Sequence, residues 1–174
     1  MLEFAENYCK LSRHKKGTTN DVRLELWEKA HLAAVFGFVD INGNRQCRES
    51  LLIVGKKNGK SLLASIVGTY MQVGDGEPGP EVYAVATKKE QARIVWNEAK
   101  RMVNKSRALR RRIKPLVAEL SSESYNEGFF KPLASDKDSL DGLNVHCVLM
   151  DEIHQWKNGK ALYDIMADGV TARD

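Results

Sequence analysis

The sequence predicts one α/β domain, residues 1–174, with a mainly parallel central sheet flanked by helices. Three apolar runs, at 51–54, 81–87 and 145–150, have the length and composition of buried strands. Segments with helical spacing of apolar residues lie between them, and turn-forming residues stand at the junctions. Strands that alternate with helices favour parallel pairing through right-handed crossovers. With 174 residues, of which 43% are hydrophobic, the chain can bury one sizeable core.

Residues 1–20 predict a short helix over 4–11 and a basic, polar loop over 13–20, and the core then covers 21–174. Within 22–38 apolar residues recur every three or four positions, which predicts an amphipathic helix. Its expected buried stripe comprises Leu24, Trp27, Ala30 or His31, Ala34, Val35 and Phe38. A turn at 42–44 leads toward the first strand.

The stretch 50–62 has the layout of a phosphate-binding loop, with an apolar strand, a glycine-containing turn and an apolar helix pattern. Backbone N–H groups in such a turn, and the start of the following helix, enclose phosphates. The residues expected to bind a nucleotide are Gly55, Lys56, Lys57, Asn58, Gly59, Lys60 and Ser61. Lys60 would reach the β- and γ-phosphates, and Ser61 would place its hydroxyl on Mg²⁺. Val54 stands where the full G-x-x-x-x-G-K-[ST] pattern has glycine, so a Gly-Lys-rich surface turn is the alternative.

A second strand and helix follow the turn at 74–80. The strand covers 81–87, and Thr87 would cap the next helix with Glu90 as its capping-box partner. The apolar stripe of this helix, which we assign to packing on the sheet, is Ala92, Val95, Trp96, Ala99 and Val103.

Residues 100–114 contain eight basic residues and no acid. They indicate either a contact with nucleic acid or a partner subunit, or the solvated end of a helix, and the sequence favours neither. The pattern that follows predicts a short hairpin, with strands at 116–119 and 128–133, and then a polar loop at 135–143.

The strand at 145–150 ends in two carboxylates, Asp151 and Glu152. Acids at the carboxyl end of a buried strand lie where ligands of open α/β sheets bind. In a nucleotide-hydrolysing site Asp151 would hold Mg²⁺, directly or through water, and Glu152 would orient and polarise the attacking water. Together with Lys60 and Ser61 this predicts an ATPase that uses ATP and Mg²⁺, with the P-loop NTPase fold of the ASCE/RecA-like type.

Composition narrows the class of protein. Residues 1–114 hold 22 Lys/Arg against 12 Asp/Glu, whereas 115–174 hold 5 against 11, an asymmetry that suits a protein meeting a polyanion on one side. The three cysteines are widely spaced, which indicates neither a disulfide framework nor a zinc site and favours a reducing compartment. No targeting or membrane segment is expected.

In its phosphate-binding loop and its acidic strand end, the chain resembles the N-terminal ATPase domain of tailed-phage terminase large subunits, the DNA-packaging motors. The resemblance covers most of 22–174 and rests on the loop 54–61, the segment 82–93, the approach 140–144 and the D-E-x-H-x-W run at 151–156. It implies a motor that hydrolyses ATP to translocate double-stranded DNA into a procapsid. The implied partners are DNA, the portal protein, the small terminase subunit and further copies in a ring, with a monomer in isolation, in the host cytoplasm.

The resemblance also assigns roles to residues. Lys60 and Ser61 match the phosphate-binding lysine and Mg²⁺-linked hydroxyl, and Asp151 and Glu152 match the metal-binding and catalytic acids. Trp27-Glu28 stands where relatives usually have Trp-Gln, and a carboxylate cannot donate to the adenine ring as an amide can. Lys56 stands where many relatives carry a charge-stabilising arginine, and lysine lacks the planar fork.

We therefore expect an arginine of a neighbouring subunit, within 101–112, to complete the site, and slow hydrolysis by the isolated chain. The family's coupling strand and nuclease domain would lie beyond residue 174, so we read the chain as truncated and expect no nuclease activity from it. The alternatives are another P-loop helicase or nucleic-acid translocase, and a non-catalytic DNA-binding module with a vestigial loop.

Overall fold

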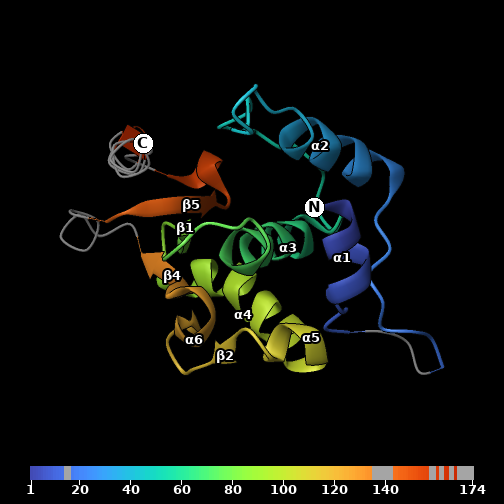
Figure 1. Ribbon diagram of the computed structural model, residues 1–174. Coiled ribbons are helices and arrows are strands. Elements are labelled where there is room, and N and C mark those ends of the chain that lie inside the picture. Colours follow the sequence, from blue (N-terminus) through green and yellow to red (C-terminus); the bar gives the residue numbers. More distant parts are fainter. Residues whose placement is uncertain (14–16, 135–142, 157–159, 161–162, 165–166, 168–174) are drawn as a thin grey trace.

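A five-stranded sheet in the order β2-β3-β4-β1-β5 lies at the centre of the computed structural model (Figure 1). The structure describes residues 1–13, 17–134, 143–156, 160, 163–164 and 167. The strands are β1 (Glu81–Ala86), β2 (Lys114–Pro115), β3 (Leu120–Ser122), β4 (Gly128–Ala134) and β5 (Val145–Met150). β1 pairs in parallel with β4 and β5, whereas β2–β3 and β3–β4 are antiparallel. The sheet is therefore mixed, and the predicted parallel arrangement holds for its β4-β1-β5 part.

Helices α3 and α4 pack side by side against the sheet and position the site (Figure 1). The helices are α1 (Leu2–Tyr8), α2 (Leu26–Phe36), α3 (Lys60–Val73), α4 (Lys89–Lys105), α5 (Arg107–Arg110), α6 (Glu123–Asn126) and the 3₁₀ turn Ile153–Gln155. α1 packs on α3 through an edge-on contact of the Phe4 and Tyr70 rings, whose centroids are 5.3 Å apart. No helix in the described part of the chain is long and apolar enough to cross a membrane.

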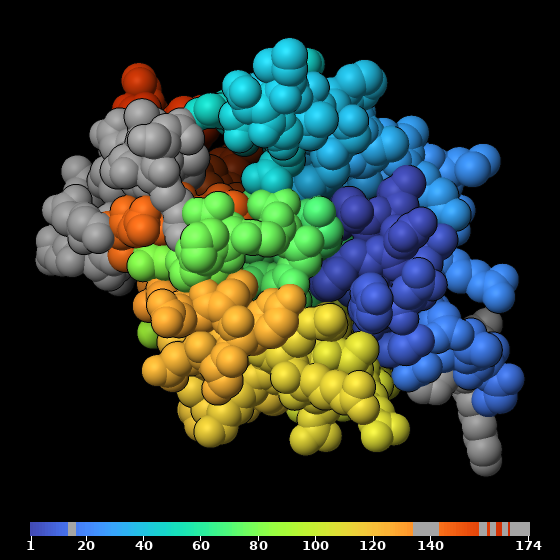
Figure 2. Space-filling view, in the orientation of Figure 1, coloured from blue at the N-terminus to red at the C-terminus, as the bar shows by residue number. Residues whose placement is uncertain are grey.

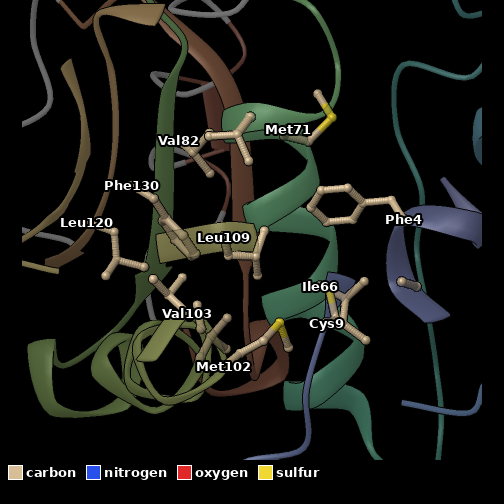
Figure 3. Close-up of a cluster of buried hydrophobic side chains, with 14 of the residues drawn as sticks. Phe4, Cys9, Ile66, Met71, Val82, Met102, Val103, Leu109, Leu120 and Phe130 are labelled. Atoms are coloured by element: carbon tan, nitrogen blue, oxygen red, sulfur yellow. The ribbon is translucent and has the colours of Figure 1, made fainter. Parts of the chain in front are cut away.

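The main core lies between these helices and the sheet (Figure 3). Side chains alternate along β1, so Val82 and Ala84 face the main core, while Tyr83 and Val85 belong to a second cluster. All four are buried. Because β1 is covered on both faces, its sequence is a continuous apolar run, as predicted.

The predicted apolar stripe of α4 is confirmed, because Ala92, Val95, Trp96, Ala99 and Val103 are all buried. The predicted cap is wrong. The helix begins one residue later, with Lys88 as its N-cap, and no side chain caps it. The Thr87 hydroxyl instead donates a hydrogen bond to Gln91 Oε1 at 2.9 Å.

Helix α3 approaches the sheet most closely at Gly68. A Cβ atom on this glycine would lie 2.8 Å from both Leu149 Cδ1 and Phe130 Cε1, closer than carbon atoms normally approach. Glycine is therefore needed here for the close contact between helix and sheet. This contact fixes the height of α3, and with it the position of the loop at its N-terminus.

The prediction of a buried strand at 51–54 is wrong. Leu51 and Ile53 are 68% and 84% exposed, and the segment pairs with no strand in the described part of the chain. Leu52 packs against the main core, so the segment still has one inward side. An apolar run gives a strand where a neighbouring backbone accepts its hydrogen bonds, and local composition does not supply that neighbour.

Other boundaries also differ from the sequence predictions. The first helix ends at Tyr8, because Cys9 is extended, and α2 is shorter than predicted. The buried positions of α2 are Glu28 and Leu32, so the predicted stripe is one position out of phase. β4 pairs with Leu120–Ser122 instead of 116–119, and the predicted loop 135–143 lies mostly outside the described residues.

Candidate nucleotide-binding site

The loop at 55–59 leads directly into helix α3. Gly59 is the N-cap of α3 and has a left-handed backbone with φ 76°, and Lys57 also has a positive φ of 67°. Asn58 Nδ2 donates a hydrogen bond across the turn to the Gly55 carbonyl at 3.3 Å. A glycine at 59 adopts this conformation without strain, so the turn can bring the chain to the helix start. No capping side chain occupies the N-terminus of α3, which leaves its N–H groups for a ligand.

Lys60, the first residue of α3, meets both acids that follow β5. Its ammonium group contacts Glu152 Oε1 directly and lies 3.5 Å from Asp151 Oδ1. These residues are about ninety positions apart in the sequence, and the packing of α3 on the sheet brings them together. The lysine side chain is 36% exposed and the two carboxylates are 18% and 27% exposed, so the group is open to solvent.

The contact shifts both charged groups in the direction of an ion pair. The hydrogen bond with Glu152 raises the pKa of Lys60 above its ordinary value, against a smaller opposing effect of burial. The hydrogen bond from Lys60 lowers the pKa of Glu152 against a smaller opposing effect of burial, and the nearby charge of Lys56 adds to the lowering. Glu152 is therefore ionised at neutral pH, and Lys56 is close enough to influence it.

The second carboxylate oxygen of Glu152 faces the 3₁₀ turn. His154 Nε2 and Gln155 Nε2 each lie 3.4 Å from Glu152 Oε2. Gln155 in turn accepts a hydrogen bond from Gln91 Nε2 at 3.4 Å, and Thr87 donates to Gln91. A polar chain thus runs from the end of β1 to Glu152, which itself has a left-handed backbone with φ 51°.

The sequence alone indicates no role for Gln91 or Gln155. The signal was a Thr and a Gln four residues apart just after a strand, which places both side chains on one face of the helix start. Their partner Gln155 lies 64 positions away, so the contact itself follows from the fold.

Asp151 is held from three sides. Its N–H donates to the Val85 carbonyl at 3.1 Å, its Oδ1 accepts the Glu152 N–H at 2.9 Å, and its carbonyl accepts from Trp156 Nε1 at 3.1 Å. Ser61, half-buried, follows Lys60 on α3. A carboxylate and a hydroxyl are oxygen donors that suit Mg²⁺, which takes one or two protein oxygens and completes its shell with waters and phosphates. The described residues contain no cluster of three or more metal-ligating side chains, and such a magnesium site needs none.

Trp27 and Glu28 lie at the start of α2. Trp27 is 38% exposed, whereas Glu28 is 7% exposed. Glu28 Oε2 accepts the Glu25 N–H at 2.8 Å as part of a capping box, and Oε1 is turned toward Gly59, where an added Cβ would lie 3.4 Å from it. Glu28 therefore borders the loop while it caps its own helix.

The basic stretch 101–112 lies at the far end of α4 from this site. Gln91, near the start of α4, contacts the turn after Glu152, and Lys105 ends the helix roughly 20 Å away. An arginine of this stretch cannot reach the nucleotide site of its own chain. If an arginine of this stretch takes part in catalysis, as predicted, it must therefore act at the nucleotide site of a neighbouring subunit.

A second ionic cluster ties the opposite ends of α3 and β5. Asp75, just after α3, accepts from Arg45 NH1 at 2.5 Å and lies 3.0 Å from His146 Nε2 on β5. Burial would raise the pKa of Asp75, but the hydrogen bonds from His146 and Arg45 outweigh it, and the pKa is lowered. The Asp75 and His146 side chains are each 9% exposed, so the cluster is largely shielded from water.

Solved structures of phage large terminases share this fold. The large terminase of bacteriophage HK97 matches with a TM-score of 0.79 over 99% of this chain and 35% of its own, at 22% identity. The large terminase ATPase domain of Thermus phage P74-26 matches with a TM-score of 0.53 over 74% of this chain and 58% of its own, at 19% identity. The chain thus spans about a third of the length of the HK97 protein.

A search among curated protein sequences finds no match. The family model of the terminase large subunit ATPase domain, however, matches residues 26–174, which includes the loop, both acids and the polar chain between them. Since this match covers most of the chain and contains the complete site, the chain belongs to the ATPase domain family of terminase large subunits.

Proposed function

We propose that this domain binds ATP at the N-terminus of α3 and hydrolyses it to drive double-stranded DNA into a procapsid. The observation that carries the proposal is the contact of Lys60 with Asp151 and Glu152. A cation at a helix N-terminus opposite two acids provides the parts that phosphoryl transfer to water needs. Family membership supports ATP hydrolysis in general, and DNA translocation is the finer step proposed here.

Each residue of the site has a proposed role. The N–H groups of Gly55 to Gly59 and of the first turn of α3 bind the phosphates, and Lys60 holds the β- and γ-phosphates. Glu152 orients and polarises the attacking water, because its carboxylate is ionised and its second oxygen is held by the 3₁₀ turn. Lys56 and Lys57 add positive charge at the open side of the loop, where both are exposed. Trp27 and Glu28 border the site.

Ser61 and Asp151 are the proposed holders of Mg²⁺. When bound, the ion neutralises charge on the phosphate oxygens. Asp151 is suited to this position because its backbone and Oδ1 are fixed by neighbouring hydrogen bonds. In the structure Lys60 bridges toward both acids, so we infer that the nucleotide replaces these acids as the partner of Lys60.

The test is ATP hydrolysis by wild type, Lys60→Ala and Glu152→Gln, each with and without duplex DNA. We expect Lys60→Ala to lose nucleotide binding, and Glu152→Gln to retain binding while its turnover falls about 10²- to 10⁴-fold. If Lys60→Ala binds and hydrolyses ATP like the wild type, the site assignment fails. Stimulation of the wild type by DNA would support the motor function.

The proposal extends to the domain organisation of the chain and to the complex in which it works. We infer that residues 1–174 form one domain, with 1–20 as an N-terminal extension of the core, and that copies assemble as a ring on the portal protein, together with the small terminase subunit, in the host cytoplasm. Because 101–112 cannot reach the site of their own chain, turnover that requires an arginine from this stretch would rise with protein concentration. Fast turnover that is independent of concentration would contradict a contribution between subunits.

A further inference from the structure

The end of α4, helix α5 and strand β2 form a basic surface remote from the nucleotide site. Its eight basic residues lie within 100–114, a stretch without acids, and we call this surface the basic face. In Figure 2 this part of the chain, in yellow, forms the lower edge of the molecule, next to the N-terminal helix in blue. Six of the eight side chains are exposed.

Four of these eight side chains already have partners in the fold. The contacts are Lys100 with the Leu116 carbonyl and the Trp96 ring, Arg101 with the Glu98 carboxylate, Lys105 with the Ser12 carbonyl, and Arg112 with the rings of Tyr8 and Tyr125. Arg112, between α1 and α6, is thus a structural residue. These contacts hold α4, α5 and their neighbours in place and so fix the position of the basic face.

The other four, Arg107, Arg110, Arg111 and Lys114, are exposed, and their side chains make no ion pair or hydrogen bond with any residue that the structure describes. The three arginines stand at i, i+3 and i+4, and Arg111 keeps helical angles (φ −73°, ψ −22°) after α5. They therefore share one face of a helical turn, with Cβ atoms about 5–6 Å apart. We call them the arginine triad.

Like charges on one face of a helical turn repel one another weakly in water, and an anion bound beside them relieves this repulsion. Leu109, from the same turn, is fully buried and anchors the turn to the core, which prevents the arginines from separating by a backbone shift. Arginine binds phosphate oxygens through two parallel N–H groups, which lysine cannot do. The arrangement is thus preorganised for a ligand that carries several phosphates.

We propose that the arginine triad binds the phosphate backbone of duplex DNA. Each DNA strand presents a phosphate every 3.4 Å along the helix axis, so neighbouring phosphates can engage three guanidinium groups that stand one helical turn apart. On the other side of β3, Glu119, Glu123 and Glu127 line an acidic hollow, which repels phosphates. In this proposal the duplex therefore lies on the side of β3 that carries α4 and α5, away from the acidic hollow.

The proposal rests on the proposed function for the identity of the polyanion. The competing ligand is an acidic protein surface or the nucleotide site of a neighbouring subunit. Duplex DNA is favoured because it presents several phosphates in a regular row, and because the function proposed for this domain is to translocate it.

The experiment measures binding of the whole chain to a short fluorescent duplex by anisotropy, over a range of salt concentrations. The test variant is Arg107→Gln/Arg110→Gln/Arg111→Gln. The control is Lys88→Gln/Lys89→Gln/Arg93→Gln, which removes the same charge from exposed positions at the other end of α4. Thermal unfolding of each variant verifies that the fold is retained, since surface changes of this kind alter stability little.

We expect the triad variant to bind DNA at least ~10-fold more weakly at low salt, and its slope of log affinity against log salt to fall in magnitude by about two to three. The control should lower the slope by less than about one. Equal losses in both variants would mean that net charge alone matters and would overturn the proposal. Unchanged DNA binding by the triad variant, with or without a loss of concentration-dependent ATP turnover, would also overturn it.

Lys60→Ala separates this proposal from the ATPase assignment. It should lose ATP hydrolysis and keep the DNA affinity and salt slope of the wild type measured without nucleotide. Weak DNA binding by the triad variant, measured without nucleotide, supports the basic face whatever the rate of its ATP turnover.

Discussion

The ion pair between Lys60 and Glu152 makes a quantitative prediction about nucleotide binding. Under the proposed function Lys60 leaves Glu152 when a nucleotide binds, so the ion pair opposes binding. Both side chains are partly exposed, at 36% and 27%, and pairs of this kind contribute about 0.2–1 kcal/mol. In Glu152→Gln this contribution is lost, and a negative charge next to the phosphates is removed as well. We expect the variant to bind nucleotide roughly 1.4- to 5-fold more tightly, from the pair alone.

Isothermal titration with a non-hydrolysable ATP analogue measures this affinity without turnover. The control is Glu98→Gln, which removes a carboxylate paired with Arg101 at 3.5 Å on α4 and should leave nucleotide affinity unchanged. Because salt screens exposed charges, the advantage of Glu152→Gln should shrink as ionic strength rises.

The same variant should lose turnover by about 10²- to 10⁴-fold, because an amide cannot polarise the attacking water as a carboxylate does. Tighter binding together with slower hydrolysis is the expected signature. If Glu152→Gln binds the analogue equally well or more weakly than the wild type at low salt, Lys60 does not have to be released from Glu152, and the reasoning is wrong.

Three further predictions concern the frame around the site. Gly68→Ala should lower the free energy of unfolding by about 1 kcal/mol, which chemical denaturation measures. Overpacking against the buried Phe130 ring costs about 1–3 kcal/mol, and the higher helix propensity of alanine offsets about 1 kcal/mol of that cost. Asp75→Asn should cost about 1–3 kcal/mol at neutral pH. The pKa of Asp75 is lower in the folded state than in the unfolded state, so its contribution to stability is present above the unfolded pKa near 4 and is lost as pH falls through the folded pKa. The variant should therefore show a flatter profile of stability against pH in acid than the wild type. Gln155→Ala removes the hydrogen bond to one oxygen of Glu152, so it should affect kcat more than KM and alter the pH profile of kcat. A loss of stability without a change in the pH profile would contradict a positioning role for Gln155.

Periodicity predicted those parts of the fold that local sequence controls. The stripe of α4 was correct because each of its apolar residues faces the same sheet, and a helix of 17 residues repeats that signal several times. The acids after β5 were also placed correctly at the end of a strand, beside Lys60. Residues 51–54 and the stripe of α2 were wrong because composition gives no information on which neighbour is available.

The buried position of Glu28 shows the same limit. The sequence analysis placed Trp27 on the buried side of the helix, yet Glu28 is buried and Trp27 is 38% exposed. Its burial depends on a capping box with Glu25 and on the nearby loop, two contacts that a helical period does not encode. The polar chain through Gln91 and Gln155 was likewise missed, because it forms between segments distant in the sequence.

Helix α3 and strand β5 are joined at both ends, by Lys60 with Glu152 at one end and by Asp75 with His146 at the other. Under the proposed function a nucleotide replaces the first connection and leaves the second, so the Asp75 end of α3 stays tied to β5 when the Lys60 end is released. Over the 14 residues of α3, about 21 Å, a displacement of about 1 Å at Lys60 corresponds to a tilt of about 3°. The Asp75–His146 contact thus holds to the sheet the end of α3 that lies opposite the lysine proposed to bind phosphate.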